Sequence, residues 1–211
     1  MKEMYDVLII GGGVVGSAMA REMSRYRLKI GVLEKNLDVC NETSGRNSGV
    51  VHGGFAYDRG SLKAKLCVEG NKMMGDLAKE LDFHFIRCGK VLVGNTEEDM
   101  ETLKRTMEQG KDNGATNLEL IDEKRLHELV PAVGKFAMFS HNSGIVDPFG
   151  YTIALAENAH ANGVEYHFGC EVTAIRREDD DTYEITTTKG NFKTRWVVNC
   201  AGLGCGKIIL S

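Results

Sequence analysis

A glycine-rich turn near the start of the chain constrains its fold more than any other feature. Residues 6 to 10 form a short apolar run, which is typical of a strand buried on both faces of a parallel sheet. Residues 14 to 25 have the composition of a helix, and a second apolar run, 28 to 33, ends in Glu34. Between strand and helix the spacing G-x-G-x-x-G is formed by Gly11, Gly13 and Gly16. This order predicts one βαβ unit.

Such a turn is suited to the pyrophosphate of a dinucleotide. The first glycine permits a tight turn, the second lets the backbone approach the pyrophosphate, and the third lets helix and strand pack closely. Free N–H groups at the start of the helix then face the phosphates. Glu34 is expected to accept hydrogen bonds from an adenosine ribose, and an acid there disfavours a 2′-phosphate. The sequence therefore predicts FAD or NAD rather than NADP, and we include the neighbouring Val15 and Lys35 among the cofactor-binding positions.

A polar loop after the acid favours FAD over NAD. Residues 38 to 57 are rich in Ser, Thr, Asn and Gly, which indicates a functional loop rather than core or linker. A nicotinamide enzyme needs no such loop at this place. Its polar side chains are expected to contact cofactor phosphates, although capping and turning the loop is the alternative. The positions concerned are Thr43, Ser44, Asn47 and Ser48, with Gly49 beside them.

The stretch from Thr43 to Gly54 resembles the second flavin-contacting segment of the D-amino-acid-oxidase-like family of FAD oxidoreductases. Within that family the chain is similar to FAD-dependent glycerol-3-phosphate dehydrogenases and L-2-hydroxyglutarate oxidases, with which it shares segments 60–66 and 142–148. Residues 197–202 resemble the later strand and turn that return to the cofactor. The resemblance implies FAD as the cofactor. It also implies that Val172 meets adenine and that two residues of the late turn contact the cofactor, Ala201 and Gly202.

The fold expected is α/β: a Rossmann-like FAD-binding domain of the glutathione-reductase kind, with an inserted and incomplete α+β substrate lobe. We assign residues 1–85 and 148–211 to the FAD-binding domain and 86–147 to the lobe. Ser61 can cap a helix reaching residue 81, whose apolar side chains should lie against the sheet. Further helices are expected over 96–113, 122–129 and 147–163, and three antiparallel strands over 170–177, 183–188 and 192–199.

His52 is the one acid–base candidate that the sequence offers, because it lies in the polar glycine-rich loop. The resemblance implies that it orients substrate, acts as a base or carries a covalent flavin link; hydrogen bonding to the loop alone is the alternative. The predicted reaction is oxidation of a secondary alcohol next to an anionic group, with hydride transfer to the flavin. An L-2-hydroxyglutarate oxidase is the second hypothesis, and a non-catalytic FAD-binding fragment is the third. The electron acceptor is a quinone, a partner subunit or oxygen.

Two departures from the family pattern affect this prediction. At 55–57 the order Phe-Ala-Tyr puts Ala56 where membrane-linked glycerol-3-phosphate dehydrogenases typically carry an arginine that helps to hold substrate phosphate. Arg59, Lys63 and Lys65 are candidates to replace it, although a cation on a helix face is more often simply solvated. Family members also continue well beyond the late turn, so we expect a fragment with most of the FAD site and only part of the substrate site.

Composition excludes several other classes of protein. The chain has 26 basic and 30 acidic side chains without a basic block, which argues against nucleic-acid binding. The longest apolar stretch, Val7 to Ala20, falls short of the ~18 to 20 residues of a membrane span, which leaves only peripheral membrane contact open. Charged residues before it argue against a secretory signal, and we expect a cytoplasmic location. Six scattered cysteines without a C-x-x-C pair predict reduced thiols and no metal site.

Overall fold

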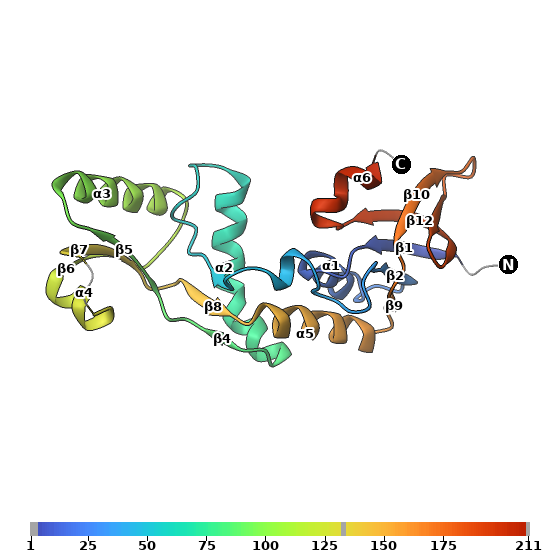
Figure 1. Cartoon of the computed structure of the whole chain (residues 1–211), viewed down its shortest axis with the longest axis horizontal. Helices are drawn as coiled ribbons and strands as arrows, with labels where there is room; N and C mark the ends of the chain where they lie inside the picture. Colours follow the sequence, from blue (N-terminus) through green and yellow to red (C-terminus); the bar gives the residue numbers. More distant parts are fainter. Residues whose placement is uncertain (1–3, 132–133, 210–211) are drawn as a thin grey trace. The chain divides into compact units, whose positions relative to one another are not determined.

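The computed structural model describes residues 4–131 and 134–209 of the 211-residue chain. It forms two compact units (Figure 1): unit 1 contains the described residues of 1–47 and 148–211, and unit 2 contains the rest. The sequence placed the first division after residue 85, whereas the compact unit 2 begins at Ser48. Packing thus groups 48–85 with the predicted lobe. Which residues constitute the FAD-binding domain stays a prediction, since compactness records packing and not cofactor contact.

Unit 1 is built on a six-stranded sheet in the order β10-β11-β12-β1-β2-β9. Its strands are β1 (Tyr5–Ile10), β2 (Ile30–Leu33), β9 (Glu165–His167), β10 (Val172–Arg177), β11 (Tyr183–Thr187) and β12 (Gly190–Asn199). β1 lies between β2 and β12 and is parallel to both, and β9 is parallel to β2. β10, β11 and β12 form the predicted antiparallel set. The predicted βαβ unit is therefore present, with α1 (Val14–Met23) between β1 and β2.

Strands β1 and β2 are buried on both faces, which explains their continuous apolar sequence. Val7 and Ile9 pack with Ala20 of α1 and Ala159 of α5 (Pro148–Ala161). Leu8 points to the opposite face, where the antiparallel strands supply the cover. Small side chains on both helices let α1 and α5 pack closely against the sheet. Two further short elements, η2 (Gly202–Gly204) and α6 (Cys205–Ile209), follow β12.

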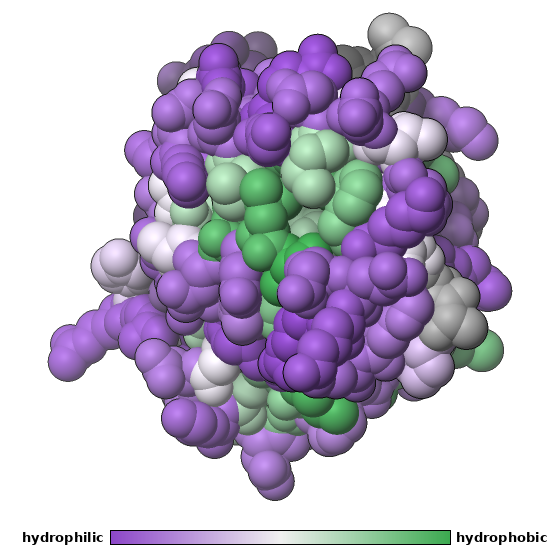
Figure 2. All heavy atoms as spheres, turned by 90° about the vertical axis from the view of Figure 1, so that its left-hand side faces the viewer, coloured by the Kyte–Doolittle hydropathy of each residue, from purple (hydrophilic) through white to green (hydrophobic). Residues whose placement is uncertain are grey.

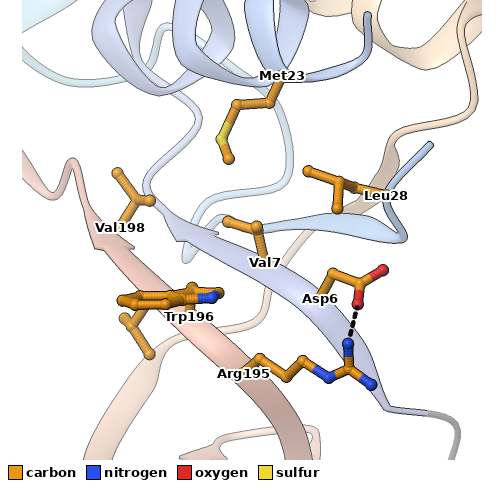
Figure 3. A pocket seen from close by; sticks show the side chains of 8 residues that line it. Asp6, Val7, Met23, Leu28, Arg195, Trp196 and Val198 are labelled. Atoms are coloured by element: carbon orange, nitrogen blue, oxygen red, sulfur yellow. Dashed lines mark ion pairs between the residues drawn. The ribbon is translucent and has the colours of Figure 1, made fainter. Parts of the chain in front are cut away.

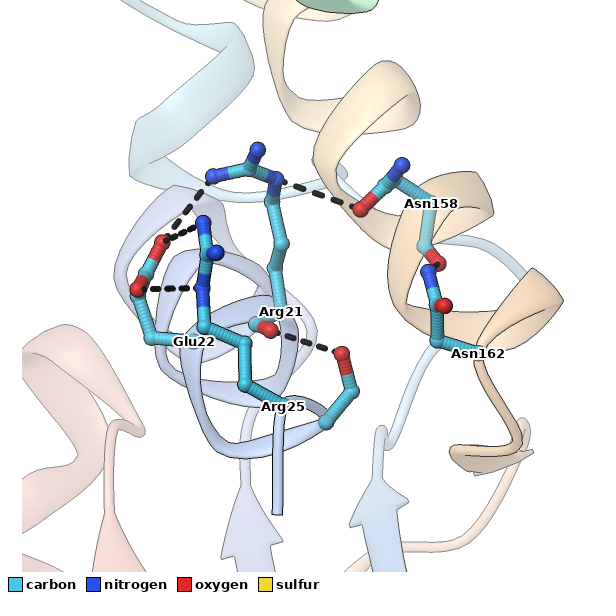
Figure 4. Close-up of polar contacts among 6 residues, drawn as sticks. Arg21, Glu22, Arg25, Asn158 and Asn162 are labelled. Atoms are coloured by element: carbon cyan, nitrogen blue, oxygen red, sulfur yellow. Dashed lines mark hydrogen bonds and ion pairs between the residues drawn. The ribbon is translucent and has the colours of Figure 1, made fainter.

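A buried arginine joins α1 to α5 (Figure 4). The Nε of Arg21 donates to Asn158 Oδ1 at 3.2 Å, and one of its terminal nitrogens lies 2.9 Å from Glu22. Glu22 also pairs with Arg25 one turn on, at 2.9 Å. The Arg21 side chain is only 8% exposed, so the carboxylate and amide offset the cost of removing its charge from water. These contacts fix α1, whose first turn carries the glycine motif.

The described residues of unit 2 form two three-stranded sheets and three helices. One sheet has the order β3-β8-β4 and the other β5-β7-β6. The strands are β3 (Val50–Val51), β4 (Phe85–Ile86), β5 (Lys90–Gly94), β6 (Leu118–Asp122), β7 (Phe136–Ser140) and β8 (Gly144–Val146). The helices are α2 (Leu62–Leu81), α3 (Glu97–Asp112) and α4 (Glu123–Leu129). Phe55, Leu103 and Met138 are central to the main core cluster, and Figure 2 shows an apolar hollow framed by hydrophilic side chains on the face that it views.

Local capping signals in unit 2 are confirmed, but the buried face of α2 was predicted wrongly. Ser61 accepts a hydrogen bond from the Ala64 amide, and Thr96 forms a reciprocal capping box at the start of α3. In α2 the predicted core residues Leu62 and Leu66 are 69% and 55% exposed, and Met73 is exposed too. The helix instead buries small or slender side chains, because the glycine-rich loop passes close to it. Its buried residues are Ala64, Val68, Asn71 and Ala78.

Candidate functional site

The backbone conformation of the glycine turn in unit 1 leaves no room for a side chain at two positions. Gly11 has φ +104°, and a Cβ there would lie 2.6 Å from the carbonyl oxygen of Cys200. A Cβ on Gly16 would overlap the Gly11 carbonyl oxygen. The Gly11 amide donates to Leu33 O at 2.9 Å, and the Cys200 amide donates to Ile10 O at 2.9 Å. The turn is therefore held between the carboxyl ends of β2 and β12, and glycine is required at both positions.

Glu34 binds directly to this turn. Its Oε2 accepts from the Gly12 amide at 2.6 Å, while Oε1 accepts from the Asn36 amide and side chain at 2.8 and 2.9 Å. The side chain is buried without a cationic partner at ion-pair distance among the described residues. The Cys170 amide donates to Glu34 O at 2.8 Å, so Val172 begins β10 only two residues from this contact. Glycine turn, acid and the start of β10 thus meet at one edge of unit 1.

The first turn of α1 leaves donors available for an anion. The Val14 amide donates to Ser44 Oγ at 2.9 Å. In the described part of the chain, the amides of Gly13, Val15 and Gly16 donate to no other group. These amides lie at the positive end of the helix. The arrangement therefore suits a phosphate, with the Ser44 hydroxyl beside it.

Other predicted cofactor residues have structural partners of their own. Thr43 and Ser44 lie in a short 3₁₀ turn, η1 (Thr43–Gly45), and Asn47 Nδ2 donates to both of their carbonyls at 3.2 and 2.7 Å. Lys35 pairs with Glu42 at 2.9 Å, and this hydrogen bond raises the Lys35 pKa. Asn47 therefore forms hydrogen bonds within its own loop, as the alternative of a turn-forming role expects. Whether these side chains also contact cofactor stays a prediction.

The remaining predicted cofactor positions fall in two places. Ala201 and Gly202 follow β12, and the Ala201 amide donates to Asn199 Oδ1 at 3.2 Å. Gly202 has φ +53° and no atom near its virtual Cβ, so the backbone there is open to a ligand. Ser48 and Gly49 belong to unit 2. The predicted contacts are thus divided between the two units at residue 47.

His52 lies in a loop of unit 2 whose carbonyls are held by side-chain amides. Asn71 Nδ2 donates to His52 O at 3.0 Å, and Gln109 Nε2 donates to Phe55 O at 3.3 Å. Asn113 Nδ2 donates to two further carbonyls, those of Gly54 and Tyr57, at 3.2 and 2.7 Å. Helices α2 and α3 therefore fix residues 52–57 from two sides. The loop is preorganised, which is what a site residue within it requires.

The His52 imidazole is neutral near pH 7 and makes no ring hydrogen bond to the described residues. Burial lowers its pKa, and the charges of Lys90 and Lys63 lower it further. The ring of Tyr57 lies edge-on at 6.2 Å between centroids. Burial raises the pKa of both Tyr57 and Cys67, so these neighbours are also uncharged. A neutral imidazole with free nitrogens is able to accept a proton.

Sequence reasoning missed the residues that support His52. Asn71 binds His52 O, Asn142 O and the guanidinium of Arg87, with donor–acceptor distances of 2.9 to 3.0 Å. Lys90 begins β5 and acts on His52 from far along the chain. The sequence signal available was an asparagine within the amphipathic pattern of α2. The leucines at helical spacing in α2 indicated a different buried face, so Asn71 was not identified.

Replacing Asn71 by alanine is expected to lower the free energy of unfolding by about 2 kcal/mol. The change removes the amide that donates to the carbonyls of His52 and Asn142, leaving only the Cys67 thiol on His52 O and Arg87 on Asn142 O. Each lost hydrogen bond contributes about 0.5 to 1.5 kcal/mol. Urea denaturation of the purified chain measures the difference. Lys72→Ala, on the exposed side of the same helix, is the control and should change stability by less than about 0.5 kcal/mol. Equal stability of the two variants would contradict the role given to Asn71.

A cavity of about 430 Å³ lies elsewhere in unit 1 (Figure 3). Val7, Met23 and Trp196 line it, and an ion pair between Asp6 and Arg195, 3.3 Å apart, lies at its edge. The cavity is at the amino end of β1, whereas the glycine turn follows the carboxyl end. Ligands of parallel sheets bind beyond the carboxyl ends, so this cavity is not the dinucleotide site.

Two further searches concern the described residues alone. Within 4–131 and 134–209, no three His, Cys, Asp or Glu side chains are grouped as metal ligands. No helix in those ranges has the length and apolar character needed to cross a bilayer.

Comparison with known proteins places the chain in a family. Residues 6–211 match the family described as FAD dependent oxidoreductase. Glycerol 3-phosphate dehydrogenase of Caloramator mitchellensis is 40% identical over 208 residues, covering 97% of this chain and 43% of that protein. Mitochondrial L-2-hydroxyglutarate dehydrogenase of Nematostella vectensis is 36% identical, covering 95% of this chain and 48% of that protein. The chain therefore spans about half the length of these relatives.

Solved structures agree with the sequence relatives. FAD-bound L-alpha-glycerophosphate oxidase from Mycoplasma pneumoniae has a TM-score of 0.85 at 29% identity, covering 92% of this chain and 53% of that one. Glycine oxidase from Geobacillus kaustophilus has a TM-score of 0.87 at 26% identity, covering 97% of this chain and 57% of that one. The expected α/β Rossmann-like fold and the resemblance to D-amino-acid-oxidase-like proteins are confirmed. The glycine turn bound to a buried acid and the match along nearly the whole length lead to one conclusion: the chain belongs to the family of FAD-dependent oxidoreductases.

Proposed function

We propose that this chain provides the FAD site and part of the substrate site of a dehydrogenase that oxidises a secondary alcohol beside an anionic group. The observation that carries the proposal is the contact between Gly12 and Glu34. It brings the ribose-binding acid to the same turn that presents free amides at the start of α1. The named relatives, a glycerol 3-phosphate and an L-2-hydroxyglutarate dehydrogenase, support this substrate class.

The residues present fit FAD. Gly11 and Gly16 leave no room for a Cβ, so the turn stays narrow. Three amides beside it have no acceptor among the described residues and can donate to a pyrophosphate. Glu34 has one acceptor position left for a ribose hydroxyl, on Oε2, because each carboxylate oxygen accepts two hydrogen bonds and Oε1 already accepts two from Asn36. The remaining cofactor contacts that we propose are Lys35, Thr43, Ser44, Asn47, Ser48, Gly49, Val172, Ala201 and Gly202.

Bound FAD would supply the acceptor for a hydride from the substrate carbon. His52 would take the hydroxyl proton at a ring nitrogen, since its lowered pKa keeps the imidazole in the neutral form. Asn71, Gln109 and Asn113 hold the loop that carries this imidazole. The protein's part in the reaction is therefore to position a proton acceptor and to bind the cofactor rigidly.

Replacing Glu34 by alanine is expected to weaken FAD binding about 10- to 100-fold. The change removes the acceptor of the Gly12 amide as well as the ribose contact, and hydrogen bonds to a charged group contribute about 1.5 to 3 kcal/mol each. Titration of the purified chain with FAD, followed by flavin fluorescence, measures the effect. Glu157→Ala is the matched control, because it removes an exposed carboxylate from α5 of the same unit, and it should bind within twofold of the wild type. Unchanged affinity in Glu34→Ala would contradict the ribose assignment.

Turnover distinguishes the candidate functions. Steady-state assays of the intact protein with glycerol 3-phosphate and with L-2-hydroxyglutarate separate the two dehydrogenase hypotheses. Turnover of neither, combined with tight stoichiometric FAD, would favour the non-catalytic FAD-binding hypothesis. Quinone, partner subunit and oxygen are the electron acceptors to compare in the same assays. A cytoplasmic location, with peripheral membrane contact left open, is also part of the proposal.

A further inference from the structure

Two lysines of unit 2 lie near aromatic rings of the loop that carries His52, Lys63 near Tyr57 and Lys90 near Phe55, and neither forms an ion pair with the described residues. We propose that Lys63 and Lys90 form the binding site for the anionic group of the substrate, a phosphate or a carboxylate. The inference rests on the proposed dehydrogenase function and assigns its anion recognition to residues of α2 and β5.

The geometry places both cations around the fixed loop. The Nζ of Lys63 lies 4.6 Å from the centre of the Tyr57 ring, which in turn is edge-on to His52. The Nζ of Lys90 lies 6.0 Å from the centre of the Phe55 ring. The two lysines therefore stand over aromatic residues of the same loop. Lowering of the His52 pKa by both charges agrees with this closeness.

Lys63 and Lys90 differ from the neighbouring Arg59 in having no acidic partner among the described residues. Within the described residues, Lys63 and Lys90 form no ion pair. Arg59, by contrast, pairs with Asp112 at 2.9 Å. Arg87 is engaged by Asn71 and the Asn142 carbonyl. Of the three cations that the sequence offered as phosphate ligands, Lys63 is the one that structure places with His52.

Unneutralised positive charge of this kind favours an anion. A bound phosphate or carboxylate would neutralise the charge of two ammonium groups that lack an acidic partner, and it would gain charge-assisted hydrogen bonds from them. Lys90 is held in place because β5 pairs with β7, with Lys90 opposite Ser140. Tyr57 is held by Asn113. The backbone around the proposed site is thus fixed before an anion arrives, which lowers the entropic cost of binding.

The location explains why the oxidised carbon would neighbour the anionic group. His52 is the proton acceptor, and both lysines act on it. Among the described residues, the charged or titratable groups that bear on His52 are Lys63 and Lys90, together with the neutral Tyr57 and Cys67 of the same neighbourhood. A substrate anchored by its anion would therefore present a nearby hydroxyl to the imidazole.

The test measures binding of inorganic phosphate to the 211-residue chain by NMR titration of the His52 ring. Four proteins are compared: wild type, Lys63→Gln, Lys90→Gln and the control Lys65→Gln. Loss of one neighbouring charge is expected to weaken phosphate binding about tenfold for Lys63→Gln and for Lys90→Gln. Lys65→Gln removes the same charge from the same helix and should bind within twofold of wild type. In wild type, phosphate should also raise the His52 pKa, since it neutralises the lysines.

Two further titrations identify the preferred anion, and the anion titrations are independent of the test of FAD binding. L-glycerol 3-phosphate and L-2-hydroxyglutarate replace inorganic phosphate in parallel titrations, so that the tighter ligand tells phosphate from carboxylate. Equal affinity in all four proteins, or no response of His52 to any of the three anions, would overturn the site. These titrations use no FAD, whereas the Glu34→Ala comparison uses no anion. Failure of FAD binding would therefore count against the proposed function while leaving the anion site standing.

Discussion

Replacing Gly16 by alanine is expected to abolish FAD binding, with a loss of at least about 100-fold in affinity. A Cβ at this position would overlap the Gly11 carbonyl oxygen, which belongs to the backbone and has no room to move. The first turn of α1 must then shift away from β1, and the free amides beside Glu34 shift with it. We also expect the free energy of unfolding to fall by about 3 kcal/mol, the cost of overpacking at a backbone contact.

Flavin titration and urea denaturation of Gly16→Ala measure both effects. Gly70→Ala is the matched control, because Gly70 lies within α2 and no atom is within 4 Å of its virtual Cβ. Alanine should stabilise that helix by about 0.5 to 1 kcal/mol, without changing FAD affinity. If Gly16→Ala bound FAD like the wild type, the close approach of α1 to β1 would not be what holds the cofactor.

Replacing His52 by glutamine is expected to reduce turnover of the intact protein about 10²- to 10⁴-fold, the usual contribution of a positioned base. FAD affinity should stay within twofold, since the substitution leaves the turn of unit 1 and the Asn71 contact to residue 52 intact. Single-turnover reduction of the flavin by substrate measures the chemical step directly. His141→Gln is the control: its ring binds the exposed Glu119 at 2.9 Å, and turnover should be unchanged.

The pH dependence gives a second, independent measure of His52. The base form is the deprotonated imidazole, so kcat/KM should rise with pH through the His52 pKa and level off above it. Because burial, Lys90 and Lys63 all lower that pKa, the rise should be complete at a pH below that for an ordinary histidine of pKa about 6.5. The same limb should be missing in His52→Gln. A profile that keeps the limb in this variant would assign the proton transfer to another group.

The glycine turn and the ends of helices could be read from the sequence because their causes are local. Gly11 and Gly16 are needed for backbone that comes within contact distance over a few residues. Ser61 and Thr96 act on amides three positions away. Requirements of this kind involve residues close together in the sequence, so they produce a recognisable residue pattern.

The buried face of α2 could not be read in the same way. Leucines at helical spacing predict a core stripe, yet Leu62 and Leu66 are exposed while Asn71 is buried. Burial here follows from the loop of residues 52–57, whose carbonyls need donors from the helix beside them. The need of a neighbouring segment for hydrogen-bond donors does not produce a repeating pattern in the sequence of the helix. Hydrophobic spacing alone therefore gives the wrong orientation.

Sequence by itself determined the βαβ unit, the dinucleotide turn with its acid, and the family to which the chain belongs, because each depends on residues close together or on an extended match. Tertiary structure alone decided which charges lie near the loop that carries His52. Lys63 and Lys90 come from different elements, and only the fold brings each of them to an aromatic ring of the loop that carries His52, while Arg59 pairs with Asp112. The physical reason is that Coulomb interactions act through distance in space, and the order of residues along the chain does not record that distance.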